Sequence, residues 1–249
     1  LRDRRAAADR SDIRTRFADI ALLKKRLLTN GKINKPNFKE DFILTKANYL
    51  LNHSVGRPLK TSEKNFSEQL YTPWKNSISE PWEQWLWIIN EFTASLAKLF
   101  NAKQSEFCPQ VNLSSGLTKI LMSLDQAQSK NCVILVSEID FPGMGFALQK
   151  SLPEDCEIRF IPSNVDITNA RVWDEYLTKD VDLVFVSHAY SNTGQLSPIS
   201  QVLSMARSRN IISILDIAQS VGIVRIDLKA LNPDFMIGSS VKWLCGGPG

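Results

Sequence analysis

Five short apolar runs, separated by segments of helical spacing, predict an α/β fold of three layers, in which a mainly parallel sheet lies between helices on both faces. The runs consist mainly of consecutive Val, Ile and Leu, which is typical of strands buried on both faces. Helices between successive strands favour right-handed crossovers and therefore parallel pairing. The predicted strands cover residues 132–136, 158–161, 183–186, 211–215 and 235–237.

The longest predicted helix covers residues 81–100. Its apolar residues recur at helical spacing, Pro81 suits a first turn and Asn101 suits a C-terminal end, so we expect one buried face. Four shorter helices are predicted at residues 117–127, 143–150, 170–178 and 199–209.

The composition excludes several classes of protein. With 249 residues, 43% of them hydrophobic, the chain can bury a core, unlike a disordered chain or a disulfide-stapled mini-protein. No apolar run approaches the length of a membrane span, and two histidines are too few for a metal site. The cysteines are isolated in the sequence and lack CxxC spacing, which predicts a reducing, cytoplasmic location; they are Cys108, Cys132, Cys156 and Cys245.

The net charge of +4 is concentrated near the start of the chain. Residues 1–30 hold nine Arg or Lys against four Asp, which leaves 21 basic and 22 acidic residues, or −1, for the rest. The body of the chain therefore gives no electrostatic reason to expect a nucleic-acid partner. We interpret residues 1–40 as a basic helical leader. A start at Leu1 and an end within Gly-Gly-Pro-Gly lead us to expect a fragment.

Ligands of parallel sheets bind beyond the carboxyl ends of the strands, so the polar residues after each run are candidate site residues. Lys242 follows the fifth run, where partial desolvation can lower the pKa of its amine as Schiff-base chemistry requires. Asp216 follows the fourth run, where its carboxylate can keep a cofactor's ring nitrogen protonated or, alternatively, cap a helix.

Two further segments suit a flat, phosphorylated ligand. Ser114 and Ser115 stand at a predicted helix start, where free backbone N–H groups bind phosphate, with simple serine capping as the alternative. Phe141, held before Pro142, can stack on a flat ring or, alternatively, belong to the core.

Together these segments resemble the aminotransferase class V family of fold-type I pyridoxal phosphate enzymes, and within it the kynureninase-like group. The resemblance runs from about residue 47 to the end. It rests on five segments in order, at residues 49–58, 138–142, 187–194, 216–222 and 238–249.

The resemblance implies a role for each candidate residue. Lys242 would carry the internal aldimine of pyridoxal 5'-phosphate, Asp216 would pair with the pyridine nitrogen and Phe141 would stack on the ring. Gln219 would approach the ring's phenolic oxygen or the phosphate. The phosphate would also meet Ser114, Ser115 and Ser239, and the substrate would meet residues of the 41–75 segment, namely Asn52, His53 and Gly56.

The resemblance further implies a homodimer, an amino-acid-like substrate and a cofactor-binding large domain at residues 76–249, with the C-terminal small domain missing. The chain departs from kynureninases at Val241 and Gln219, where they usually have tyrosine and histidine. Transamination, β-elimination and Cβ–Cγ hydrolysis all stay open. The alternatives are a cysteine desulfurase or other β-lyase, and a non-catalytic binding module. Cys245, three residues past the lysine, is interpreted as a packing residue.

Overall fold

The structure, a computed structural model, describes residues 37–247. The chain divides into two compact units, residues 1–42 and 43–249. In the first unit the described residues form a 3₁₀ turn, η1 (Phe38–Asp41), which begins after Asn37, whose side chain accepts the amide hydrogen of Lys39. The predicted leader therefore lies, except for its last four residues, outside the described part of the chain.

The second unit contains a five-stranded sheet in which every pairing is parallel, in the order β2-β1-β3-β4-β5. Each strand lies within one residue of its predicted boundaries. The sheet confirms the predicted fold class. The strands are β1 (Val133–Ser137), β2 (Glu157–Ile161), β3 (Leu183–Ser187), β4 (Ile212–Asp216) and β5 (Phe235–Ile237).

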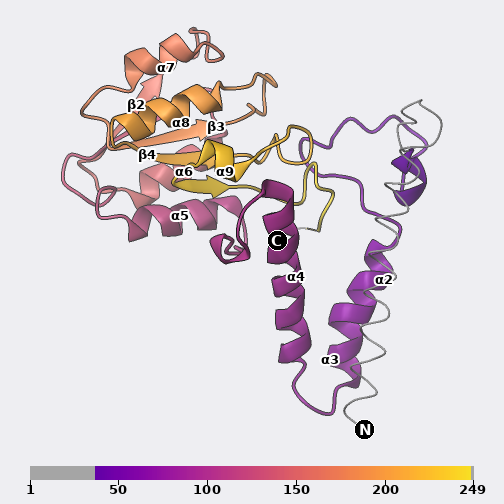
Figure 1. Ribbon diagram of the computed structural model, residues 1–249. Coiled ribbons are helices and arrows are strands. Elements are labelled where there is room, and N and C mark those ends of the chain that lie inside the picture. Colours follow the sequence, from indigo (N-terminus) through magenta and orange to yellow (C-terminus); the bar gives the residue numbers. More distant parts are fainter. Residues whose placement is uncertain (1–36, 248–249) are drawn as a thin grey trace. The chain divides into compact units, whose positions relative to one another are not determined.

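Helices lie on both faces of this sheet (Figure 1). Successive residues of each strand point to opposite faces, so neighbouring residues of one strand pack against different helices. Leu135 and Val184 belong to the core cluster that includes Trp173 of α7 and Leu203 of α8, whereas Ile134 belongs to the cluster formed with α5 and α6. The helices are α5 (Leu113–Ser123), α6 (Pro142–Ser151), α7 (Ala170–Tyr176) and α8 (Ile199–Ser208).

The prediction that every strand is buried on both faces is correct for β1 and β3 and wrong for β2. Strand β2 is an edge strand with one neighbour, and the ring of Phe160 is 49% exposed. An apolar run alone does not distinguish an edge strand from a central one, since position in the sheet is decided by the crossovers.

The helix predicted at 117–127 differs most from the structure. Helix α5 begins at Leu113 because the Asn112 side chain accepts the amide hydrogen of Ser115 at 2.8 Å and so caps the first turn. It ends at Ser123 rather than near residue 127.

The long predicted helix is present as α4 (Trp82–Phe100), with Asn101 in the left-handed conformation at its C-terminal end. Its predicted buried face is wrong: only Thr93 and Phe100 are buried. Large apolar side chains are instead exposed along the helix, namely Trp82, Leu86, Trp87, Ile89, Phe92 and Leu99.

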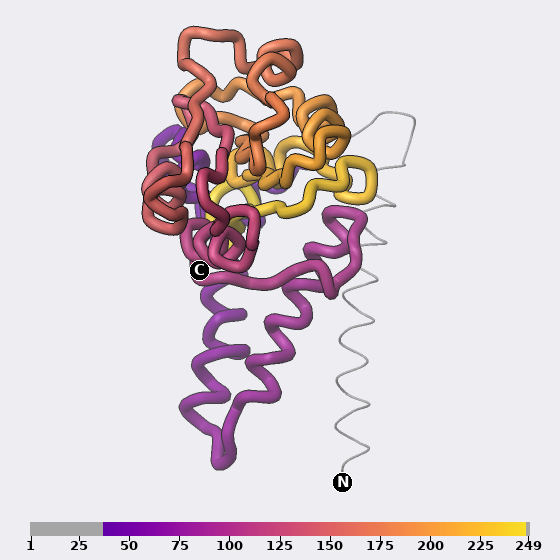
Figure 2. Tube along the Cα trace, turned by 90° about the vertical axis from the view of Figure 1, so that its left-hand side faces the viewer, coloured from indigo at the N-terminus to yellow at the C-terminus, as the bar shows by residue number. Residues whose placement is uncertain are grey.

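The sequence did not predict the short helices that precede α4. They are α2 (Ser62–Phe66), a π-helical turn η2 (Ser67–Tyr71) and α3 (Thr72–Asn76). They run alongside α4 in both views (Figures 1 and 2), and the Trp85 indole N–H donates to the Leu70 carbonyl at 3.3 Å. Two other short turns, η3 (Gln104–Glu106) and α9 (Leu228–Leu231), were also not predicted.

A disulfide joins Cys132 to Cys156, which corrects the expectation of isolated cysteines. The parallel register pairs Val133 of β1 with Glu157 of β2, so the residues just before the two strands lie side by side, with Cα atoms 4.7 Å apart. Cys108 and Cys245 are free thiols.

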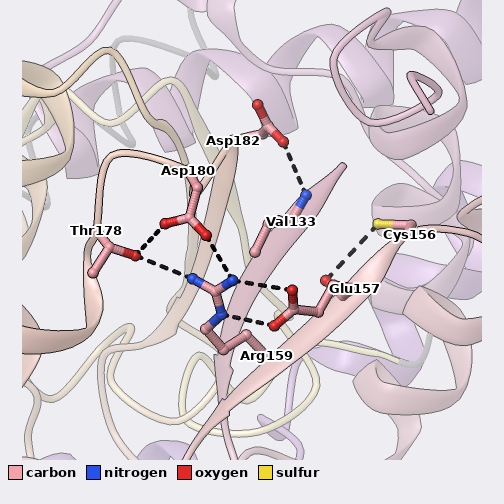
Figure 3. Close-up of polar contacts among 7 residues, drawn as sticks. All are labelled: Val133, Cys156, Glu157, Arg159, Thr178, Asp180 and Asp182. Atoms are coloured by element: carbon pink, nitrogen blue, oxygen red, sulfur yellow. Dashed lines mark hydrogen bonds and ion pairs between the residues drawn. The ribbon is translucent and has the colours of Figure 1, made fainter. Parts of the chain in front are cut away.

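A polar cluster connects β2 to the loop that precedes β3 (Figure 3). Arg159 of β2 forms ion pairs with Glu157 and Asp180, each at 2.8 Å, and donates to the Thr178 hydroxyl at 3.0 Å. Hydrogen bonds to these carboxylates raise the pKa of Arg159, and Arg159 lowers the pKa of Asp180. Exposed pairs of this kind stabilise a fold little, but charge on an edge strand opposes edge-to-edge aggregation.

Replacing both bridged cysteines (C132S/C156S) should lower the free energy of unfolding by about 3 kcal/mol, because the disulfide closes a 24-residue separation in the unfolded chain. Urea unfolding measures this difference, with the exposed Cys108→Ser as the matched control. Thiol titration of the denatured protein, purified without reductant, should detect only Cys108 and Cys245. Detection of all four thiols would contradict the disulfide.

Candidate functional site

A cavity of about 230 Å³ lies at the carboxyl edge of the sheet, where side chains from strand ends and following loops meet. Five of the predicted site residues line it, namely Ser114, Phe141, Asp216, Gln219 and Lys242. Seven residues that were not predicted as site residues complete the lining: Asn112, Leu113, Met144, Ser187, Ala189, Ser191 and Ala218.

Lys242 projects into this cavity from the loop that follows β5. It is half-buried, and its Nζ lies 5.7 Å from the centroid of the Phe141 ring. Burial lowers the pKa of the Lys242 amine, and the negative charge of Asp216 opposes that shift. The structure therefore favours a neutral, nucleophilic amine at this position more than water would.

Asp216 is the last residue of β4 and is only 7% exposed. Its Oδ1 accepts the amide hydrogen of Ala218 at 2.8 Å. Burial raises the pKa of Asp216 to about 6, while this hydrogen bond and the charge of Lys242 act in the opposite direction. A buried carboxylate in the same cavity as an amine is suited to pair with a protonated nitrogen of a ligand.

Asp140 is a second carboxylate, partly buried, which the sequence-based predictions missed. Its Oδ1 accepts the Ser187 hydroxyl at 2.6 Å, and its Oδ2 accepts the Ser137 amide hydrogen at 2.8 Å. Burial raises the pKa of Asp140 to about 7, and the nearby charge of Asp216 adds to the increase. The available signal was the position of Asp140, directly before Phe141 and just past a strand.

The loop after β3 contributes a buried polar group beside this carboxylate. The Ser197 hydroxyl donates to the Ser187 carbonyl at 2.7 Å and lies 3.3 Å from the hydroxyl of Tyr190. The backbone N–H of His188 donates to the Asp216 carbonyl at 2.8 Å, which ties this loop to β4. Burial lowers the pKa of the His188 imidazole, whose Nδ1 has no partner among the described residues.

The predicted phosphate-binding serines occupy different positions. Ser114 lines the cavity at the N-terminus of α5, whereas Ser115 and Ser239 are not among its lining residues. The amide hydrogen of Ser115 is already accepted by Asn112, as an N-cap requires. The hydroxyl of Ser114 and the start of the α5 backbone are therefore the groups best placed to meet a phosphate here.

The predicted substrate residues are not among those that line the cavity, and Gly56 is bonded to the Lys242 loop. The Gly56 N–H donates to the Val241 carbonyl at 2.7 Å, and the His53 carbonyl accepts from the Gln219 side chain at 2.9 Å. The side-chain oxygen of Asn52 is buried and has no partner among the described residues.

These groups fit the pyridoxal phosphate that the sequence resemblance implies. The cavity combines an amine of lowered pKa, a buried carboxylate, an aromatic face 5.7 Å from the amine and a helix N-terminus with a serine. The amine suits the cofactor's aldehyde and the carboxylate suits its ring nitrogen. The aromatic face suits its flat ring, and the helix N-terminus suits its phosphate. Within the described residues, no group of three or more His, Cys, Asp or Glu could hold a metal ion.

The family model for aminotransferase class V matches residues 57–249, so the chain belongs to this family. It is 23% identical over 223 residues to a kynureninase of Shouchella clausii, covering 85% of this chain and 52% of that protein. It is 26% identical over 210 residues to a kynureninase of Deinococcus radiodurans, covering 81% and 49%. The chain thus spans about half the length of these curated relatives.

Solved structures confirm the fold. The chain matches C-DES with glycine covalently linked to its PLP cofactor at a TM-score of 0.77 and 20% identity, over 86% of this chain and 58% of that one. It matches an apo cysteine desulfurase of Thermococcus onnurineus at a TM-score of 0.68 and 18% identity, over 80% and 50%. No described helix is long and apolar enough to cross a membrane.

The buried carboxylates predict a pH dependence of stability. The pKa of Asp140 is about 7 in the folded state and about 4 in the unfolded state, so the folded protein binds the extra proton between these values. Stability should therefore decrease as the pH rises from about 4 to about 7, by up to a few kcal/mol. Asp140→Asn should reduce this decrease, because it removes the titrating group.

Urea unfolding of the cofactor-free protein at about pH 5 and about pH 8 measures the effect. The exposed Asp155→Asn is the matched control and should keep the wild-type pH dependence. An Asp140→Asn variant with an unchanged decrease would show that Asp140 does not titrate in this range.

Proposed function

We propose that the protein is a pyridoxal phosphate-dependent enzyme that acts on an amino acid or related amine through Lys242. The observation that carries the proposal is the convergence of the Lys242 amine, the Asp216 carboxylate and the Phe141 ring on one cavity. Membership of the aminotransferase class V family supports it, and so do the kynureninases among the relatives.

When bound, pyridoxal phosphate supplies an electron sink for the charge that develops at the substrate Cα. The Lys242 amine would hold the cofactor through its aldehyde and, when free, would act as the general base that takes the proton from Cα. Asp216 would hold a proton at the ring nitrogen, and Phe141 would lie against the ring. Ser114 and the α5 N-terminus would bind the phosphate, and the phosphate contacts of Ser115 and Ser239 stay predictions.

The reaction that follows is proposed only as a class: transamination, β-elimination or Cβ–Cγ hydrolysis. Among the known structures with this fold are a cystine C–S lyase and a cysteine desulfurase, which keeps a desulfurase-type reaction as the alternative.

Cys245 lies against Gly56, and its Sγ donates to the Trp243 carbonyl at 3.7 Å, which favours packing over a nucleophilic role. A purely binding role is disfavoured because the lysine, the aspartate and a serine of the α5 N-terminus are all present in one cavity.

Substitution of Lys242 by alanine should abolish the visible absorbance of the lysine-bound cofactor. The full-length protein is incubated with pyridoxal phosphate, dialysed and scanned. Lys150→Ala, an exposed lysine on α6, is the matched control and should keep the wild-type band. Absence of any band in the wild type, or an unchanged band in Lys242→Ala, would overturn the proposed function.

We also propose that the full-length protein is a homodimer in which α4 packs against a second copy. Six large apolar side chains are exposed on this helix, which has few charged residues, and apolar patches of this kind mark protein interfaces. Leu86→Glu should shift the molar mass in light scattering from dimer toward monomer, whereas the exposed Lys98→Glu on the same helix should not. A monomeric wild type would contradict the proposal.

The absence of a nucleic-acid or membrane partner completes the proposal. It is supported by the near-neutral body of the chain, in which 21 basic residues face 22 acidic ones beyond residue 30. The cytoplasmic location expected from isolated cysteines loses its basis, because Cys132 and Cys156 form a disulfide and such bonds are rare in the cytosol.

A further inference from the structure

The loop that carries Lys242 is fastened to a segment almost two hundred residues earlier in the chain. We name residues 240–246 the lysine loop and residues 52–57 the N-terminal strap. The Gly56 N–H donates to the Val241 carbonyl at 2.7 Å. A Cβ at Gly56 would lie 2.0 Å from the Lys242 carbonyl oxygen, so only glycine allows this approach.

Gln219 forms a second connection between the strap and the lysine loop. Its Nε2 donates to the His53 carbonyl at 2.9 Å, and its Oε1 accepts the indole N–H of Trp243 at 2.9 Å. Both ends of the Gln219 amide are therefore committed to other parts of the protein. Gln219 also lines the cavity, so its approach to the cofactor, implied by the family resemblance, stays a prediction.

The two connections hold Lys242 from both sides. Val241 precedes it and is bonded to the strap, and Trp243 follows it and is bonded to Gln219. Gly222, at a φ of +88°, packs closely against the Trp243 carbonyl, since a Cβ there would lie 3.2 Å from this oxygen.

The lysine loop lies outside helices and strands, so contacts of this kind define its position. Its internal hydrogen bonds are short-range, from Cys245 to Lys242 and from Gly246 to Ser240. A nucleophile must be held within a fraction of an ångström for efficient reaction.

We infer that Trp243 is a positioning residue for Lys242, acting through Gln219 and the strap. The inference rests on the proposed function in which Lys242 binds pyridoxal phosphate. The indole N–H fixes Gln219, Gln219 fixes the strap at His53, and the strap fixes the lysine loop at Val241. The amine is thereby kept beside Phe141 and Asp216 in its partly desolvated position.

Trp243→Phe tests the inference, because it removes the indole N–H and keeps an aromatic ring. The dissociation constant of pyridoxal phosphate should rise roughly tenfold, as expected for one lost hydrogen bond of about 1.4 kcal/mol. The pH midpoint of the cofactor's visible spectrum should rise by up to about one unit, since a looser loop admits water to the Lys242 nitrogen. A purely structural role would lower the melting temperature and leave this midpoint unchanged.

The matched control is Trp74→Phe, at a 69% exposed tryptophan of α3, which should leave both quantities unchanged. Gln219→Leu should reproduce the Trp243→Phe effect, and the double variant should be no worse than Gln219→Leu alone, because the residues act through one bridge. Wild-type affinity and midpoint in Trp243→Phe, or fully additive effects, would overturn the inference.

A measurement on the cofactor-free protein separates this inference from the proposed function. Hydrogen exchange of the lysine loop should be faster in Trp243→Phe than in the wild type, whether or not pyridoxal phosphate binds. Equal exchange rates would overturn the connection itself. A wild type that lacks the visible band would instead overturn the proposed function and, with it, the role assigned to Trp243.

Gly56→Ala tests the strap from the other side. The added Cβ should push the strap off the lysine loop and weaken pyridoxal phosphate binding at least tenfold, with faster exchange of the loop. Gly145→Ala, whose Cβ would meet nothing within 4 Å on α6, is the matched control and should bind as the wild type does. Equal binding by both variants would contradict a positioning role for the strap.

Discussion

The parallel register of β3, β4 and β5 is the constraint on which the site depends. It places Ser187 beside Asp216 and Asp216 beside Ile237, so three strands end at one level. The chain leaves each strand into a loop that reaches the same cavity, and Lys242 follows β5 by only a few residues. Because helices cover both faces of the sheet, side chains at this edge are buried while the cavity stays accessible.

Burial at this edge determines the electrostatics of the site. It raises the pKa values of Asp216 and Asp140 and lowers that of Lys242, so each group moves toward its neutral form. Hydrogen bonds from Ala218 and Ser187 and the mutual attraction of Lys242 and Asp216 offset part of the desolvation. With pKa values of about 6 and about 7, Asp216 and Asp140 can gain or lose a proton near neutral pH, which suits proton transfer.

Two segments in the N-terminal part of this unit differ in what they contact. Residues 52–57 pack against the lysine loop, whereas α4 leaves its apolar side chains exposed. An exposed apolar face is the kind of surface that the proposed second copy would cover. Amphipathic spacing therefore identified the helix correctly but not what covers it.

The local sequence pattern determined the strands of this protein and three residues of its candidate site. Apolar runs and helical spacing predicted the strands to within one residue, and the position of Lys242, Asp216 and Phe141 directly after strands predicted that they would meet, because parallel strands share one carboxyl edge. Only the tertiary structure decided which strand lies at the edge, that Cys132 faces Cys156, and that Gln219 bonds to Trp243 and His53. Such pairs depend on register and packing between distant segments, which no local spacing encodes.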